Sequence, residues 1–284
     1  MTLIRTYGIV GLLIMIIAEI LMLSDVRIVS ASFTPIVWTG YILFIDSLIF
    51  KLKGESLISS RPKELWLMLS LSIGFWLVFE LYNVYIPNWH YINLYTNQAI
   101  RWFHYAWSFA TIYPAIFQTT ELLLALHLFD RRLTKKFVLS ARWRYSLLII
   151  GLIFLIMPPL QPPEIARYLW APIWIGFIML LEPVNYWLKQ DSLLGDLEQG
   201  KLERMISLFV ASYICGFLWE FWNYWAYTKW VYIVPFTPNV RIFEMPILGF
   251  LGFGFFALEC HVVYNWAKAM IGLISKKYAR ALLS

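Results

Sequence analysis

The apolar residues of this chain occur in blocks long enough to cross a lipid bilayer, and this limits the possible folds more than any other feature. We predict eight such blocks, at about residues 7–24, 34–51, 65–86, 102–128, 145–162, 167–188, 205–226 and 243–267. At about 1.5 Å of helix per residue, roughly 20 residues span the hydrocarbon core. Of the 284 residues, 61% are hydrophobic and 14% are charged, whereas soluble domains average about 25% charged residues. The sequence therefore predicts an all-α polytopic membrane protein with about eight transmembrane helices.

The basic residues predict the orientation of these helices. Of the 23 Lys and Arg residues, 18 fall on the side of the bilayer that carries both termini, and only five fall on the other side: Arg27, Arg101, Arg167, Lys229 and Arg241. Because Lys and Arg concentrate in cytoplasmic segments, we expect a multi-pass protein of the cell membrane with cytoplasmic N- and C-termini. This orientation accounts for the net charge of +6 without nucleic-acid binding. No small-residue cleavage site follows the first apolar block, so we expect no cleavable signal peptide.

Two stretches of the chain resemble each other closely enough to predict an internal duplication. WTGYILFIDSLIFKLKGESL (38–57) and WIGFIMLLEPVNYWLKQDSL (174–193) share seven of twenty residues without a gap. Further along, Glu80 and Asn83 match Glu220 and Asn223 as two ExxN motifs. Four spans in each unit preserve orientation, so the repeats are parallel, about an axis along the membrane normal. We expect one integral membrane domain made of two four-helix repeats, residues 1–137 and 138–284, joined at the basic stretch 130–144.

A polar layer is predicted near the outer ends of the spans. The i, i+3 spacing places each Glu and Asn of the ExxN motifs on one helix face. An Arg and a further polar residue follow at the start of the next span, which gives two matching sets: Glu80, Asn83, Arg101 and His104, and Glu220, Asn223, Arg241 and Glu244. We expect Arg101 to pair with Glu80, Arg241 to pair with Glu220, and each Asn to donate a hydrogen bond to its carboxylate. Structural clamps and catalytic sites are both compatible with this pattern.

Two aromatic segments follow the ExxN motifs. NWHYINLY (88–95) and KWVYIVPF (229–236) alternate with a period of two, which indicates extended chain rather than helix. They are predicted to form either an interfacial belt of Trp and Tyr or a cover over the outer polar layer.

A second polar layer is predicted toward the cytoplasm. It contains four acids in the inner halves of their spans, with no Lys or Arg beside them in the same helices: Asp46, Glu121, Glu182 and Glu259. We match Glu121 with Glu259 in the two repeats. Unpaired acids within a membrane are rare and commonly functional, so Glu121 and Glu259 are candidate catalytic groups. No metal-binding spacing is present, and Cys215 and Cys260 are expected to act as small apolar residues, so we expect neither a metal nor another cofactor.

Three functions fit these features. The first is an enzyme that acts on a lipid or isoprenoid inside the bilayer, in which a carboxylic acid protonates an alkene or epoxide and aromatic rings stabilise the cation. The acid would be Glu121 or Glu259, or Glu220 if Arg241 points elsewhere. Glu80 is its counterpart in the first repeat, and Trp219 and Trp222, which lie close to Glu220 in sequence, are the candidate aromatic residues for substrate binding. Acyl, prenyl or head-group transfer at the outer face is an open variant.

The second function is a carrier whose acidic stations lie at the repeat interface. The third is a non-catalytic assembly protein, in which the polar clamps are purely structural. In each case the expected partners are membrane lipids, with a hydrophobic small-molecule substrate for the enzyme, and the oligomeric state stays open.

Overall fold

The computed structural model describes residues 4–130, 136–237 and 239–281, and it confirms an all-helical fold with little sheet. In the described part of the chain, six helices are long and apolar enough to cross a membrane. They are α1 (Thr6–Leu23), α3 (Phe33–Lys53), α5 (Pro62–Tyr85), α8 (Ala141–Ile156, extended by the 3-10 turn η1, Pro158–Leu160), α12 (Glu203–Trp225) and α13 (Phe250–Ala281, preceded by η2, Ile247–Gly249).

The other two predicted spans are helical but do not form single long apolar helices. The stretch 102–128 is divided at Thr111 into α6 (Gln98–Ala110) and α7 (Ile112–Ala125). The hydroxyl of Ser72 accepts a hydrogen bond from the Tyr113 amide at 3.1 Å and donates to the Phe109 carbonyl, so a side chain of α5 bonds the backbone across the break. The stretch 167–188 contains α10 (Trp170–Trp187), which has Pro183 inside it.

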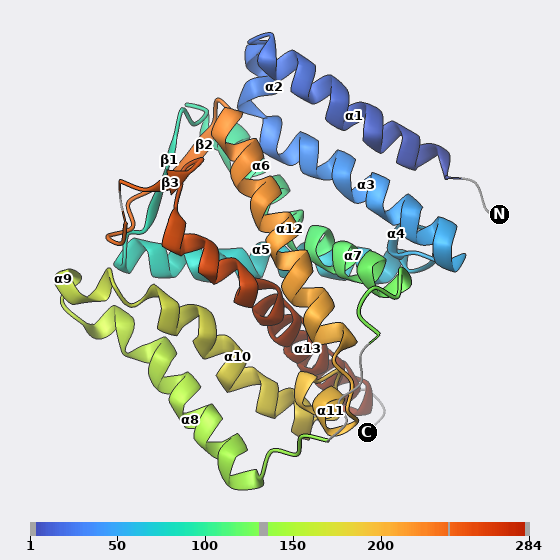
Figure 1. Ribbon diagram of the computed structural model, residues 1–284, viewed down its shortest axis with the longest axis vertical. Coiled ribbons are helices and arrows are strands. Elements are labelled where there is room, and N and C mark those ends of the chain that lie inside the picture. The colour runs from blue at the N-terminus through green and yellow to red at the C-terminus, as the bar shows by residue number, and fades with distance from the viewer. Residues whose placement is uncertain (1–3, 131–135, 238, 282–284) are drawn as a thin grey trace.

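The short elements gather at the two ends of the helix bundle (Figure 1). α2 (Arg27–Ala31), α9 (Pro163–Ala166) and the strands lie toward one end. α4 (Leu57–Ser60) and α11 (Leu193–Glu198) lie toward the other, together with the first turn of α1 and the last turns of α13. Both ends of the described chain are therefore on the same side of the bundle. Of the predicted seam between the repeats, residues 131–135 lie outside the described residues.

Glycines allow the closest helix contacts. A Cβ on Gly11 of α1 would lie 2.5 Å from the Gly40 carbonyl oxygen of α3, and a Cβ on Gly151 of α8 would lie 2.8 Å from the Gly176 carbonyl oxygen of α10. Both distances are shorter than any tolerable contact, so a side chain at either position would push the helices apart. Small residues at such crossings let helices associate in a lipid environment.

The helices differ in how much of their surface the protein covers. In an apolar stretch of 18 residues from each helix, only 22% of the residues of α1 and 17% of those of α8 are buried, against 61% for α3. The apolar side chains that α1 and α8 turn outward suit contact with lipid tails. Large rings fill the interior, and the fully buried ones include Trp38, Phe79 and Tyr113.

Two short ribbons lie at the end of the bundle away from the chain termini. β1 (Trp89–Ile92) pairs antiparallel with β2 (Lys229–Tyr232), in a register that sets Trp89 opposite Tyr232 and Tyr91 opposite Trp230. β3 (Arg241–Ile242) pairs with β4 (Met245–Pro246). The period-two pattern thus correctly indicated extended chain, and the two aromatic segments bond to each other.

Candidate functional site

A cavity of about 480 Å³ lies among the helices and is lined in part by the β1–β2 ribbon. Its volume falls in the range of small-molecule sites, which is about 300–1,000 Å³. Its wall is mainly aromatic, drawn from both halves of the sequence, and includes Trp38, Trp76, Trp89, Trp174, Trp219 and Trp230. Polar side chains also line it, and Glu220 is the one acidic residue among the described residues of this lining.

Glu220 extends from α12 and is fully buried. Its Oε1 accepts a hydrogen bond of 2.8 Å from the hydroxyl of Tyr232. Its Oε2 has no hydrogen-bond partner within the described parts of the chain. Burial raises the pKa of the Tyr232 hydroxyl well above its usual range, and the adjacent Glu220 raises it further. Tyr232 therefore stays protonated and acts as the donor to this carboxyl group.

The predicted pairing of Glu220 with Arg241 is wrong. Arg241 lies in β3 and is exposed, and its Nη1 donates to the Glu244 carbonyl at 3.4 Å. The physical reason is that the last span does not begin at residue 243. The β3–β4 ribbon occupies this stretch, and α13 starts only at Phe250. Arg241 therefore does not stand at a helix start beside Glu220.

The predicted pairing of Glu80 with Arg101 is also wrong. Glu80 Oε1 accepts hydrogen bonds from the indole nitrogens of Trp76 and Trp89 and, at 2.6 Å, from the hydroxyl of Tyr91. Arg101 instead donates to backbone carbonyls, from Nε to Tyr95 at 3.0 Å and from Nη2 to Thr96 at 3.3 Å. Aromatic donors, rather than a cation, hold this carboxylate.

Glu80 faces a second hollow of about 370 Å³, which lies between α5 and α6. Its outer rim carries apolar side chains with large exposed areas, such as Leu81 and Trp102. Tyr91, Tyr105 and Phe109 line both this hollow and the main cavity. Three aromatic side chains therefore stand between the cavity and a surface suited to lipid.

Asn83 and Asn223 do not donate to the carboxylates as predicted. The amide of Asn83 accepts from the backbone nitrogen of Trp89 at 3.1 Å and donates to its carbonyl at 2.9 Å. Asn223 brackets Trp230 in the same way, at 3.0 and 2.9 Å. Each Asn thus fixes one strand of the ribbon to the end of the helix before it.

His104 and Glu244 have unrelated environments. His104 lines the cavity, with Nε2 2.8 Å from the Ser32 hydroxyl and Nδ1 2.8 Å from the Ile100 carbonyl. Since a carbonyl only accepts, Nδ1 carries a proton. Glu244 forms an ion pair of 2.5 Å with Lys229, and both side chains are mostly buried. The matching of these two positions in the predicted outer layer is not seen.

The two candidate tryptophans also separate. Trp219 lines the cavity, and its ring centroid lies 5.1 Å from that of Trp38. Trp222 is buried outside the cavity wall, and its indole nitrogen donates to Glu19 Oε1 at 3.0 Å. Glu19, the one acid inside the most apolar span, escaped the sequence analysis, although its isolation there was a usable signal.

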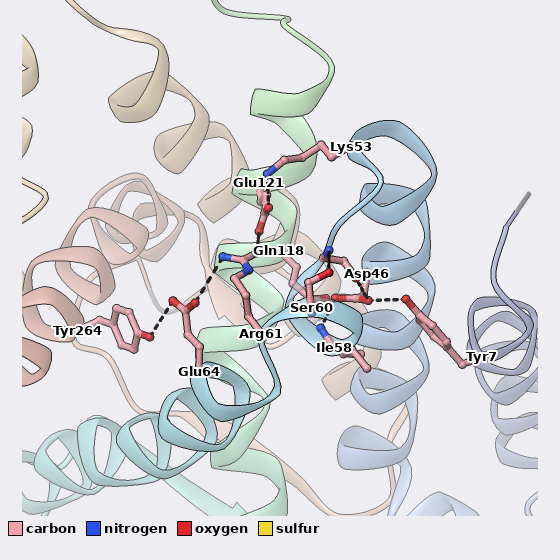
Figure 2. A network of polar contacts seen from close by, with 11 residues as sticks. Tyr7, Asp46, Lys53, Ile58, Ser60, Arg61, Glu64, Gln118, Glu121 and Tyr264 are labelled. Atoms are coloured by element: carbon pink, nitrogen blue, oxygen red, sulfur yellow. Dashed lines mark hydrogen bonds and ion pairs between the residues drawn. The ribbon is translucent and has the colours of Figure 1, made fainter. Parts of the chain in front are cut away.

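Glu121 is not an unpaired acid, contrary to prediction. Its carboxylate lies between Lys53 and Arg61 (Figure 2). The Lys53 Nζ is 2.5 Å from one carboxylate oxygen, and the Arg61 Nη2 is 2.6 Å from the other. Both cations come from the end of α3 and the loop before α5, which is why a search along the acid's own helix did not find them. Glu121 is therefore a structural ion-pair centre.

The other acids of the inner layer divide into two kinds. The buried carboxylates of Asp46 and Glu182 accept hydrogen bonds from the backbone amides of Ile58 and Leu194, at the starts of α4 and α11, and thus hold short helices in place (Figure 2 shows Asp46). Glu259 is fully buried in α13, and neither carboxylate oxygen has a partner among the described residues. Glu259 does not line the cavity. The described residues contain no group of three or more potential metal ligands.

Comparisons with protein-family models, with curated proteins and with solved structures gave no match to this chain.

Proposed function

We propose that this protein is an integral membrane enzyme that acts on a lipid or isoprenoid within the bilayer, with Glu220 as its acid. One observation carries the proposal: a fully buried carboxyl group with one unpartnered oxygen lines an aromatic cavity. The sequence made Glu220 a candidate on the condition that Arg241 points elsewhere, and that condition is met. Glu121 is neutralised by two cations and Glu259 lies outside the cavity, so neither fits the role as well.

The chemistry requires the protonated form of Glu220. Tyr232 occupies Oε1, so the proton resides on Oε2. Oε2 gives this proton to one carbon of an isolated double bond, whose π electrons form the new C–H bond and leave a cation on the other carbon. A second double bond of the same molecule then closes a ring on the cation. Loss of a proton to the Glu220 carboxylate restores the acid, so the net reaction is an isomerisation that needs no co-reactant.

The cavity wall supports this chemistry. A cation over a desolvated aromatic face gains about 2 kcal/mol or more. Trp38 and Trp219 lie in ring contact at the wall, and Phe256 contacts Trp219 with ring centroids 5.6 Å apart. Such rings stabilise a carbocation without attacking it as water would, which favours ring closure over hydration.

The test is comparative lipid mass spectrometry of host cells that lack the chain, express it, or express Glu220→Gln. A lipid whose abundance or retention changes only with the intact chain would support the enzyme, because isomers share a mass but separate by chromatography. Glu164→Gln, an exposed change in α9, is the matched control and should behave as the intact chain does. Unchanged lipids in cells whose membranes contain the protein would rule the proposal out.

We also propose that the chain is a parallel duplication of two four-helix units, residues 1–137 and 138–284, with both termini cytoplasmic. Contacts that recur support this. Ser212 joins the Phe253 carbonyl to the Ala257 amide as Ser72 joins Phe109 to Tyr113. These serine contacts match Glu121 with Asn265 rather than with Glu259, so the predicted equivalence of the two acids is dropped. The basic residues beside α4 and α11 favour the cytoplasm for that end.

A proton-coupled carrier is the second candidate, and Glu259 is the observation that favours it. A fully buried acid without a partner is costly, and its place in α13 near the middle of the bundle suits a proton station. Proteoliposomes would show proton-coupled flux that Glu259→Gln abolishes and Glu220→Gln leaves intact. Absence of flux for cations and lipids would exclude the carrier.

A further inference from the structure

Three basic residues line the aromatic cavity, and they come from three separate elements. Arg101 is in the first turn of α6, Arg167 lies between α9 and α10, and Lys229 begins β2. Among the described lining residues, Glu220 is the one acidic residue, so basic side chains outnumber acidic ones.

The charge of Lys229 is compensated, whereas the charges of the two arginines are not. Lys229 pairs with Glu244 at 2.5 Å. Arg101 bonds only to uncharged carbonyls among the described residues. Arg167 donates to the Tyr168 hydroxyl at 3.0 Å, and its guanidinium lies 4.9 Å from the centre of that ring. Two guanidinium groups at one cavity thus lack a carboxylate among the residues that the structure describes.

Along α6, the residues that line the cavity change from basic to aromatic. Arg101, Tyr105 and Phe109 follow at intervals of four, so they lie on one helix face, and all three line the cavity. The cation stands at the end of α6 nearest the ribbon, and the two rings lie further into the bundle. The rings of Tyr105 and Phe109 are stacked with centroids 5.7 Å apart. This face is basic at one end and apolar along the rest.

We propose that the cavity binds an amphiphile whose phosphate or diphosphate head lies at Arg101 and Arg167 and whose hydrocarbon chain lies among the aromatic rings. Guanidinium groups are suited to phosphate oxygens because they offer several donors in one plane. The chain then reaches Glu220, which is in the same cavity. The catalytic consequence rests on the proposed function, but the binding does not.

The test measures binding to the purified full-length protein in nanodiscs of zwitterionic lipid. The probes are geranylgeranyl phosphate, the uncharged geranylgeraniol, and inorganic phosphate as a competitor. We expect the phosphorylated probe to bind about 10-fold more tightly than the alcohol, which corresponds to about 1.4 kcal/mol. The combined Arg101→Gln and Arg167→Gln changes should remove this preference and leave alcohol binding unchanged. Arg142→Gln, an exposed change in α8, is the matched control.

Equal binding of the two probes by the intact protein would overturn the proposal, and so would an unchanged preference in the double variant. Competition by millimolar inorganic phosphate equal to that by the amphiphile would show a simple anion site and would also overturn it. Because Arg101 also holds the loop before α6, its replacement could disturb the fold. Arg167→Gln alone, at an exposed position, is therefore a second test. It should lower the affinity for geranylgeranyl phosphate about 3-fold and leave the affinity for the alcohol unchanged.

Glu220→Gln separates this inference from the proposed function. It should bind geranylgeranyl phosphate as the intact protein does, because the variant keeps both arginines. Selective binding together with unchanged cellular lipids would leave the amphiphile site standing and remove the catalytic role of Glu220. A lipid change that depends on Glu220, with no preference for the phosphate, would do the reverse.

Discussion

Glu80 and Glu220 occupy the same motif, yet their surroundings differ in the number of donors. Trp76 stands four residues before Glu80 and donates to it, whereas Gly216 stands four residues before Glu220 and offers no side chain. A Cβ at Gly216 would lie 2.5 Å from the ring of Phe253, so this position has no room for a tryptophan. The indole of Trp230 donates to the Tyr232 hydroxyl at 2.8 Å, while that of Trp89 donates to Glu80. Three donors therefore hold Oε1 of Glu80, whereas Oε1 of Glu220 has one donor and its buried Oε2 has no partner among the described residues.

This difference predicts unequal effects of two matched changes. Tyr232→Phe removes the hydrogen bond to a fully buried carboxyl group and should lower the free energy of unfolding by about 1–3 kcal/mol. Tyr91→Phe leaves Glu80 with two indole donors and should cost about 0.5–1.5 kcal/mol. Thermal unfolding in detergent measures both. The explanation fails if Tyr91→Phe proves the more damaging change. Turnover of the lipid substrate should fall in Tyr232→Phe alone.

Single residues also show what the sequence could not reveal. Both predicted Arg–Glu pairs rested on similar depth along neighbouring helices, which brings side chains near each other but does not choose partners. In the structure, indole and hydroxyl groups from β1 and β2, rather than the arginines, donate hydrogen bonds to the two carboxylates. Donors of this kind carry no charge and so leave no charge pattern in the sequence.

Among the elements, the packing of α1 on α3 and of α8 on α10 depends on glycines at the helix crossings. Gly11→Ala and Gly151→Ala should each destabilise the protein by about 1–3 kcal/mol, since the added methyl group meets the backbone of the neighbouring helix. Gly74→Ala in α5 is the matched control, because a Cβ there meets no atom within 4 Å. It should stabilise by about 0.5–1 kcal/mol, the usual gain in a helix interior. A loss of stability in Gly74→Ala would contradict this account.

The short helix α4 depends on one buried carboxylate. Asp46 accepts hydrogen bonds from Tyr7, Ser56, Gln118 and the Ile58 amide, so it links α1, α3, α4 and α7. Asp46→Ala strands these donors and should cost about 3 kcal/mol or more. Glu182→Ala removes the acceptor of two donors, from Ser192 and Leu194, and should cost less. Chemical unfolding of both variants ranks them, and the reverse order would be incompatible with this role.

For the whole molecule, the sequence correctly predicted an all-helical fold and extended chain in the two aromatic segments, and six of the eight predicted spans, among the described residues, are helices long and apolar enough to cross a membrane. It missed the break at Thr111 and the ribbon that replaces the start of the last span. Periodicity reports which face of a segment is buried, but it does not report which distant segment covers that face. The aromatic cavity combines residues from both halves of the chain, so no local pattern could outline it.

The orientation of the whole molecule is testable with introduced thiols, because Cys215 and Cys260 are buried and should not react. Ser59→Cys and Gln199→Cys lie near α4 and α11, at the end expected to face the cytoplasm. Glu164→Cys lies in α9 at the opposite end. A membrane-impermeant maleimide added to intact cells should label Glu164→Cys alone, and permeabilised cells should show all three. Labelling of Ser59→Cys in intact cells would show that the orientation is the opposite of the one proposed.

The register of the β1–β2 ribbon also bears on how such a molecule can be assembled. Each strand sets its tryptophan opposite the tyrosine of the other, so two copies of one strand could close the same ribbon. The main-chain hydrogen bonds between β1 and β2 would therefore form even if the two strands had the same sequence. Chains of residues 1–137 and 138–284, produced as separate polypeptides in one cell, can be expected to dock through this ribbon and to copurify.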